Sequence, residues 1–153
     1  MTLQATKKFA DKLKNDFGCD SLAVQVDITS EIQVKRAVNE VFNRFNKIDV
    51  LINNAAMNPA VGTKEADIQF VPYENYPIDL WNKEIAVNLT GAMICIKGVT
   101  TIMIKQKKGV IINIASELSE IAYDHRIYEK GRFKSVAYIT TKTGILGLTR
   151  AWA

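Results

Sequence analysis

The sequence predicts an α/β protein with a doubly wound parallel sheet, in the order αβαβαβα and three layers deep. Two short apolar runs, residues 48–56 (IDVLINNAA) and 109–116 (GVIINIAS), have the near-continuous pattern of strands buried on both faces. Segments with helical periodicity lie before, between and after them, and their lengths suit right-handed crossovers between parallel strands. We expect one domain over residues 1–153.

The first half of the chain supplies two helices and a further strand. Residues 1–17 have an amphipathic helical pattern, and residues 21–28 form a β-branched run that predicts a strand. The next helix begins after Ser30, which stands three residues before Gln33 in capping-box spacing, and it continues to about residue 45.

The second half alternates loops with apolar helices. Residues 57–78 contain all three prolines and no clear period, so we expect a long surface loop. Residues 79–106 predict a long helix covered on two sides, and residues 137–153 predict a last helix after the polar and aromatic segment 117–136.

Composition excludes several classes of function. The net charge of +4 comes from lysines scattered over several helices, which predicts a solvated basic surface and no nucleic-acid site. Cys19 and Cys95 have neither disulfide nor metal spacing, so we expect a reducing cytoplasm and no metal. The longest apolar stretch, residues 85–104, is interrupted by polar residues, which favours a buried helix over a membrane span.

Polar residues gather where the predicted strands end, which is where ligands bind in such sheets. Asp27, Asn53, Asn54 and Ser116 terminate strands, and Tyr138 begins the next helix.

Tyr138 and Lys142 lie four residues apart on one helix face, so a phenol and an ammonium could act at one point. Each candidate also has a structural interpretation. Asn88 would satisfy a backbone group at a helix kink, Ser116 would cap a turn, and Asp27 would cap the next helix. The adjacent asparagines would tie loops together, and the solitary His125 would be solvated.

Five motifs in this order resemble the classical short-chain dehydrogenase/reductase family, over essentially all 153 residues. They are VDIT (26–29), NNAA (53–56), VNLTG (87–91), INIAS (112–116) and YITTK (138–142). The resemblance implies a Rossmann-like fold and hydride transfer between NAD or NADP and an alcohol or carbonyl substrate.

The resemblance also implies a catalytic tetrad of Asn88, Ser116, Tyr138 and Lys142. Tyr138 would exchange the proton that accompanies hydride transfer. A free phenol has a pKa of about 10, so a neighbouring ammonium is needed to stabilise the phenolate. Lys142 would be that ammonium and would also bind the nicotinamide ribose. Ser116 would orient the substrate oxygen, and Asn88 would hold a water that links Lys142 to solvent.

The cofactor contacts implied by the family fall on the same end of the sheet. Asp27 would contact the adenine amino group, and Ile28 would add a backbone contact. Asn54, Ala55 and Ala56 would line the cofactor site, together with Tyr138 and Lys142. The family usually has Gly where this chain has Ala56.

The segment between Ser116 and Tyr138 is longer than is common in the family. Residues 121–133 (IAYDHRIYEKGRF) therefore look like an insertion above the active site, and their chemistry suits a polar or anionic substrate such as a sugar or polyol. The candidate side chains are Tyr123, His125, Arg126, Tyr128, Arg132 and Phe133.

The chain resembles an internal portion of the family, an incomplete NAD(P)-binding domain. It lacks the N-terminal Gly-rich turn that holds the pyrophosphate and the C-terminal strands. In the family's strand order, 3-2-1-4-5-6-7, it keeps the third, fourth and fifth strands. We therefore expect the strand at 21–28 to pair with the strand at 48–54 or with another chain.

Two hypotheses follow. The chain is a dehydrogenase, with homo-oligomer contacts through helices 79–106 and 137–153, or it is an inactive fragment or assembly module that cannot bind the dinucleotide.

Overall fold

The computed structural model describes residues 3–59, 63–128 and 130–153. The longer elements are α1 (Leu3–Phe17), α2 (Glu31–Phe45), β1 (Val50–Asn53), α3 (Lys64–Gln69), α4 (Ile78–Ile85), α5 (Gly91–Gln106), β2 (Val110–Asn113) and α6 (Val136–Trp152). Short 3-10 helices form η1 (Tyr73–Asn75), η3 (Glu117–Ser119) and η4 (His125–Ile127), and a π-helical turn forms η2 (Ala86–Thr90).

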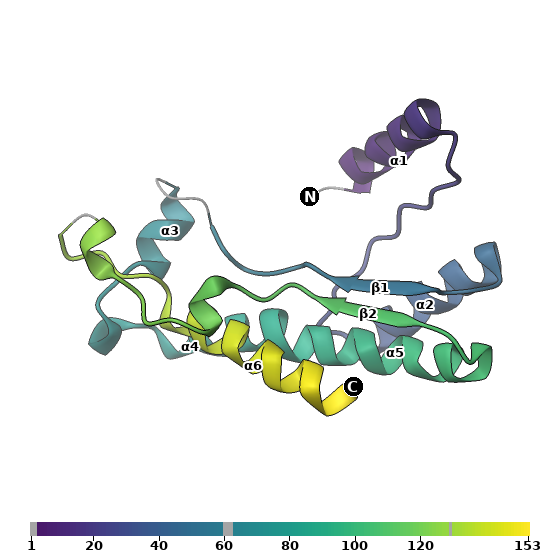
Figure 1. Cartoon of the computed structure of the whole chain (residues 1–153). Helices are drawn as coiled ribbons and strands as arrows, with labels where there is room; N and C mark the ends of the chain where they lie inside the picture. Colours follow the sequence, from purple (N-terminus) through teal and green to yellow (C-terminus); the bar gives the residue numbers. More distant parts are fainter. Residues whose placement is uncertain (1–2, 60–62, 129) are drawn as a thin grey trace.

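The two strands pair in parallel, with Val50 opposite Val110 and Asn53 opposite Asn113. Helices α2, α5 and α6 lie on one side of this sheet, and α1 lies on the other side (Figure 1). The predicted α/β class and parallel sheet are therefore confirmed, and the predicted helices at both ends of the chain are present.

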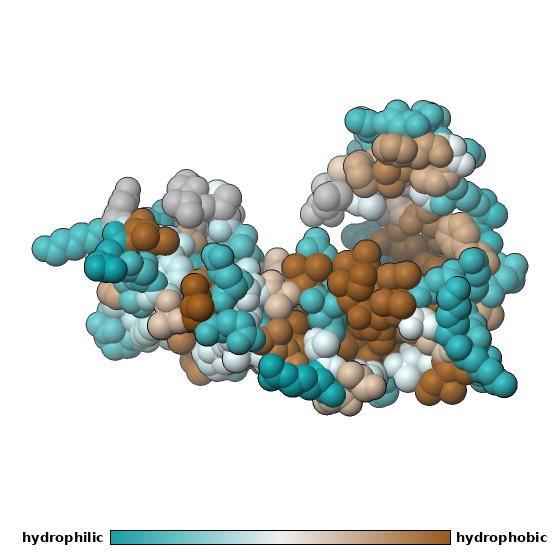
Figure 2. Space-filling model, viewed as in Figure 1, coloured by the Kyte–Doolittle hydropathy of each residue, from teal (hydrophilic) through white to brown (hydrophobic). Residues whose placement is uncertain are grey.

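The prediction that both strands are buried on both faces is wrong. Leu51 and Ile111 face the helices, but Val50, Ile52 and Val110 are between 49% and 58% exposed on the opposite face. Figure 2 shows the resulting apolar patch over the strands. The physical reason is visible in Figure 1, where an irregular connection holds α1 away from the sheet.

The predicted strand at residues 21–28 is also wrong for this chain. The segment forms no ladder with β1 and runs as irregular chain from α1 to α2 (Figure 1). A cavity of about 420 Å³, lined by Leu22 and Val24 on one side and by Val50 and Leu51 on the other, lies between the segment and β1. Because this space separates the two backbones, they cannot hydrogen-bond to each other.

The predicted helix at 79–106 is one continuous helical stretch, Ile78–Gln106, made of α4, η2 and α5. By length and composition alone it could cross a membrane, but its α5 part packs against α2 and β1. Gly98 permits this close packing, since an added Cβ would lie 3.2 Å from the Val34 side chain. The buried residues Ile96 and Val99 make this helix the centre of the core.

The segment 57–78 is more ordered than the predicted surface loop. Thr63 caps α3 by accepting a hydrogen bond from the Ala66 N–H, at 3.2 Å. Ala66 and Phe70, one helical turn apart, are buried, and the Phe70 ring packs edge-on against Tyr128. Local capping and this tertiary contact override the proline-rich composition; residues 60–62 lie outside the described residues.

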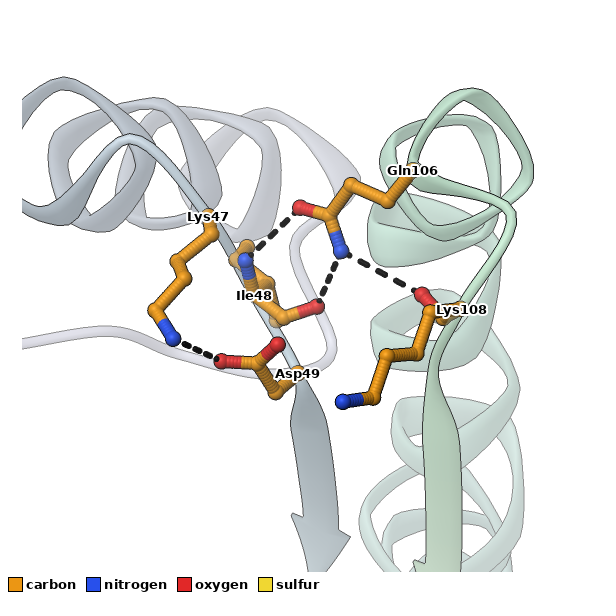
Figure 3. Close-up of polar contacts among 5 residues, drawn as sticks. All are labelled: Lys47, Ile48, Asp49, Gln106 and Lys108. Carbon is orange, nitrogen blue, oxygen red and sulfur yellow. Dashed lines mark hydrogen bonds and ion pairs between the residues drawn. The ribbon is translucent and has the colours of Figure 1, made fainter.

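The amino-terminal end of the sheet is held by one glutamine (Figure 3). The Gln106 amide accepts from the Ile48 N–H at 3.0 Å and donates to the Ile48 carbonyl at 2.8 Å, as a neighbouring peptide group would. It also donates to the Lys108 carbonyl, while Lys47 and Asp49 form an ion pair beside it. This clamp aligns the starts of both strands, so their carboxyl ends also lie together.

Candidate active site

Tyr138 and Lys142 share one face of α6, as their spacing predicts. The Lys142 Nζ lies 5.8 Å from the centre of the Tyr138 ring. The Lys142 side chain is only 5% exposed, and it donates to the Ile114 carbonyl, just after β2, at 2.5 Å. Burial lowers the pKa of Lys142 from its ordinary value, because the charged form loses hydration.

The start of α6 is fixed by a buried hydrogen-bond cluster that the sequence analysis missed. Ser135 caps the helix by accepting from the Tyr138 N–H at 3.0 Å, and its hydroxyl donates to Glu84 Oε2 at 2.9 Å. The Tyr76 hydroxyl donates to the other Glu84 oxygen and lies 2.8 Å from the Ser135 hydroxyl. The one available signal was Ser135 itself, a preferred N-cap residue directly before a predicted helix.

This cluster places a carboxyl group in the core. Glu84 is fully buried, and burial raises its pKa above the ordinary value, against the opposing effect of its hydrogen bonds with Tyr76 and Ser135. The pKa of Tyr76 is also raised, first by burial and then by the Glu84 contact. The cluster therefore joins Glu84 of α4 and Tyr76, the residue just after η1, to Ser135 immediately before α6.

Lys134 is a second buried cation at the same place, and the sequence analysis missed it too. It is 8% exposed, and its Nζ donates to Asn58 Oδ1 at 2.6 Å. The same atom lies 4.4 Å from the Tyr138 ring centre and 5.2 Å from the Phe70 ring centre. Burial lowers the pKa of Lys134, and the Glu84 charge partly opposes this effect.

Asn88 links the loop after β1 to two helices. It is buried in the π-helical turn η2, where its Oδ1 accepts from the Met57 N–H at 2.6 Å. Its amide donates to the Met57 carbonyl and to the Thr141 hydroxyl, both at 3.3 Å. Asn88 thus satisfies backbone groups at a helix irregularity, as the structural interpretation expects, and it touches the α6 turn between Tyr138 and Lys142.

Ser116 follows β2 and caps η3. Its hydroxyl accepts from the Leu118 N–H, and its own N–H donates to the Ser119 hydroxyl, each at 3.3 Å. Because η3 packs against α6, this serine is held on the side of the sheet that carries Tyr138.

Asp27 lies at the end of the irregular segment and is exposed. Its Oδ1 accepts from the Thr29 N–H at 2.9 Å and from the Thr29 hydroxyl at 2.7 Å, and these bonds lower the pKa of the carboxyl group. The N-cap of α2 is Ser30, as predicted, while the Gln33 side chain accepts from the Asp27 N–H. The Ile28 side chain packs onto Gly91 at the start of α5.

The residues after β1 remain accessible. Asn54, Ala55 and Ala56 are exposed at the carboxyl end of the strand. Of the two adjacent asparagines, Asn53 links β1 to β2, because its side-chain amide donates to Asn113 Oδ1 at 2.8 Å. Asn113 in turn donates to Thr149 of α6 at 3.0 Å, so Asn54 is left facing outward.

The segment 121–133 folds against α3 and η1 as an aromatic cluster. The His125 ring is half-buried and lies 4.9 to 5.6 Å from the ring centres of Phe133, Tyr123 and Tyr73, so the expectation of a solvated histidine is wrong. The imidazole Nδ1 is buried without a partner, while its Nε2 lies 3.5 Å from the Tyr73 hydroxyl.

The charged residues of this segment differ in their setting. Arg126 is exposed and pairs with Asp124, whereas Arg132 pairs with Asp67 of α3 at 2.8 Å. Tyr128 contacts Phe70. Among the described residues, no group of three His, Cys, Asp or Glu side chains could hold a metal ion.

Comparison with known proteins gives consistent matches. The short chain dehydrogenase family matches residues 1–153. An uncharacterized oxidoreductase, YxjF, of Bacillus subtilis is 33% identical over 150 residues, which is 98% of this chain and 51% of that protein. The structure of an NAD⁺-bound xylitol dehydrogenase superposes with a TM-score of 0.81 at 32% identity, covering all of this chain and 52% of that one.

A further structure, ElxO with NADP bound, superposes with a TM-score of 0.78 at 26% identity, covering 97% of this chain and 53% of that one. The chain thus spans about half the length of the relatives it matches. With the family match extending over its full length, the chain belongs to the short chain dehydrogenase family.

Proposed function

We propose that this chain carries the proton-transfer site of an NAD- or NADP-dependent oxidoreductase that interconverts an alcohol and a carbonyl compound. One observation carries the proposal: Tyr138 and the buried Lys142 ammonium lie on one face of α6, beside the carboxyl end of β2. Lys142 places a buried cation beside the phenol, and Tyr138 would give or take the proton at the substrate oxygen during hydride transfer.

The other tetrad members would act through position. Ser116 uses its oxygen to accept from Leu118, which leaves the hydroxyl hydrogen available to donate to a substrate oxygen. Asn88 ties the α6 turn to the loop after β1 through Thr141 and Met57, and we propose that it also orders the water that resupplies protons to Lys142.

The residues present fit the nicotinamide end of a dinucleotide. Lys142 has three N–H donors, and the Ile114 carbonyl takes one, so two remain that would serve ribose hydroxyls. Asn54, Ala55 and Ala56 leave an accessible edge after β1, and Asp27 offers a carboxylate for an adenine amino group. When bound, the cofactor would donate or accept the hydride.

The substrate class is proposed from chemistry and likeness together. The segment 121–133 brings aromatic and basic side chains beside α3, which suits a polar substrate. Since the NAD⁺-bound relative is a xylitol dehydrogenase, we propose a sugar or polyol.

We propose a cytoplasmic homo-oligomer whose contact includes the helix Ile78–Gln106 and α6. Ile104 and Trp152, near the ends of these helices, are 69% and 43% exposed. Light scattering coupled to gel filtration tests this assembly: a monomer at all concentrations would refute it.

The experiment that tests the function has two stages. Calorimetric titration with NAD⁺ and NADP⁺ measures cofactor binding, and nicotinamide absorbance then follows oxidation of polyols. We expect micromolar binding and activity that the substitution Tyr138→Phe abolishes, while the matched substitution Tyr73→Phe, in η1 and outside the segment 121–133, retains it. No heat at millimolar cofactor would favour the alternative, an assembly module that does not bind the dinucleotide.

A further inference from the structure

The loop that follows β1 is anchored at two neighbouring residues. Met57 bonds through its backbone to Asn88 of η2, and the Asn58 side chain accepts a hydrogen bond at 2.6 Å from the Lys134 ammonium. Residues 54–56, just before these anchors, form an exposed edge at the end of the strand. The position of this edge therefore depends on the two anchors that follow it.

Lys134 is an unusual residue for such an anchor. It is 8% exposed, although its partner Asn58 is exposed and carries no charge, and a lysine ammonium is costly to bury without a charged partner. A hydrogen bond from a charged donor is roughly twice as strong as one between neutral groups. We therefore expect the Lys134–Asn58 bond to hold the loop more firmly than an ordinary surface contact.

Two aromatic rings from different elements support this ammonium. The Lys134 Nζ lies 4.4 Å from the ring centre of Tyr138 in α6 and 5.2 Å from the ring centre of Phe70, the C-cap residue of α3. Phe70 is 3% exposed, and its carbonyl accepts from the N–H of Phe133, the residue before Lys134. Attraction to both rings restricts the ammonium, so the bond to Asn58 begins from a fixed point.

We propose that Lys134 is a positioning residue that holds the exposed edge after β1, residues 54–56, beside the start of α6. The inference rests on the proposed function, in which this edge lines the cofactor site and Tyr138 exchanges the proton. One side chain contacts both parts, because the Lys134 ammonium bonds Asn58 and packs on the Tyr138 ring. An edge that is already in place lowers the cost of ordering it when a cofactor binds.

Hydrogen exchange at the Met57 N–H, measured by NMR, tests the Lys134–Asn58 bond without cofactor or substrate. This N–H donates to Asn88 and lies next to Asn58, so its exchange rate reports how often the loop opens. We expect Lys134→Met to speed the exchange by about tenfold, the low end for loss of one hydrogen bond to a charged group. Asn58→Ala should speed it equally, and the double variant should exchange no faster than either single variant, because both remove the same bond.

Two variants serve as matched controls. Asn58→Asp keeps an oxygen acceptor for the ammonium, so the Met57 N–H should exchange no faster than in the parent; combined with Lys134→Met, the aspartate should give no protection. Lys7 is exposed on α1, so Lys7→Met removes an equal charge from another element and should leave the exchange unchanged. Circular dichroism checks the fold, and Asn58→Ala, at an exposed position, tests the same bond if Lys134→Met does not fold.

Calorimetric titration with NAD⁺ and NADP⁺ then tests the consequence for the site. Lys134→Met and Asn58→Ala should each raise the Kd of the cofactor that the parent binds by about tenfold, because the edge must then be ordered during binding. Asn58→Asp and Lys7→Met should retain the Kd of the parent, which a general loss of stability in the first two variants would not explain.

Met57 exchange at the parent rate in both Lys134→Met and Asn58→Ala would overturn the inference. Rates that multiply in the double variant would also overturn it, since the two residues would then act independently, as would an unchanged Kd where the parent binds cofactor. Failure of the proposed function is a separate result: the parent then binds no cofactor at millimolar concentration, and the exchange rates alone decide whether Lys134 holds the edge.

Discussion

Replacing Ser135 by Ala should cost more stability than removal of an ordinary helix cap. The Ser135 hydroxyl accepts from the Tyr138 N–H at 3.0 Å and donates to Glu84 Oε2 at 2.9 Å. Ser135 is 1% exposed and Glu84 is fully buried, so water cannot replace the lost bonds. The substitution therefore removes a cap and also leaves a buried carboxyl oxygen short of a donor.

The two losses have separate magnitudes. Loss of an N-cap serine costs about 1 kcal/mol. Leaving a buried polar atom without its partner costs about 1–3 kcal/mol. The sum predicts that Ser135→Ala lowers the free energy of unfolding by about 2–4 kcal/mol.

Ser30 is the matched control, because it caps α2 with a bond from the Gln33 N–H and contacts no buried carboxyl group. Ser30→Ala should therefore cost only about 1 kcal/mol. Urea unfolding followed by circular dichroism measures both variants against the parent, with equal transition slopes required for the comparison. Equal losses in the two variants would refute the reasoning, since they would mean that the Glu84 contact adds nothing.

Three further predictions concern neighbouring positions. Asn88→Ala should lower the free energy of unfolding, measured in urea, by about 2 kcal/mol, because backbone groups of the loop after β1 lose their hydrogen-bond partners. The substitution should also speed proteolysis of this loop, and an unchanged cleavage rate would contradict the prediction. Gly147→Ala should stabilise the chain by about 0.5–1 kcal/mol, because the added Cβ would meet nothing within 4 Å. Gly91→Ala should instead destabilise the chain by about 1 kcal/mol, because the added Cβ would lie 2.8 Å from the Ile28 side chain. Thermal unfolding should show shifts of opposite sign, and shifts of the same sign would count against the packing argument. The pKa of Glu84 is raised in the folded chain, so folding favours the protonated carboxyl group. The stability that this group contributes is full at pH values below its ordinary pKa of 4.5, and it is lost as the pH rises through the higher pKa of the folded chain. Glu84→Gln, measured by urea unfolding across this range, should therefore show a weaker loss of stability with rising pH than the parent, and parallel pH profiles would argue against it.

Local patterns were sufficient to predict most helices. The Ser30 cap, the apolar periodicity of 79–106 and the helix that carries Tyr138 are all present, because helical hydrogen bonds join residues close in sequence. The parallel pairing of β1 and β2 was also predictable, since both strands are apolar runs joined by a helical crossover.

Strand pairing at 21–28 was not predictable from its composition. A β-branched run becomes a strand only where a neighbouring backbone supplies hydrogen bonds, and here a cavity separates the segment from β1. The same dependence on neighbours explains why Val50 and Ile52 are exposed. Their apolar side chains predicted burial on this face of the sheet, but α1 does not pack against it (Figure 1).

The candidate site divides in the same way. By itself the sequence determined that Tyr138 and Lys142 share a helix face and that Ser116 follows a strand, because periodicity is a local property. The grouping of Asn88 with them was implied only by the resemblance to the family. Tertiary structure alone decided that Lys134 lies over the Tyr138 ring and that Glu84 bonds the cap of α6. Glu84 and Ser135 are dozens of positions apart in the sequence, so no local pattern predicts their hydrogen bond. Lys134 is close to Tyr138 in the sequence, but its place over the ring depends on how its long side chain is buried, and spacing along the chain does not encode that desolvation.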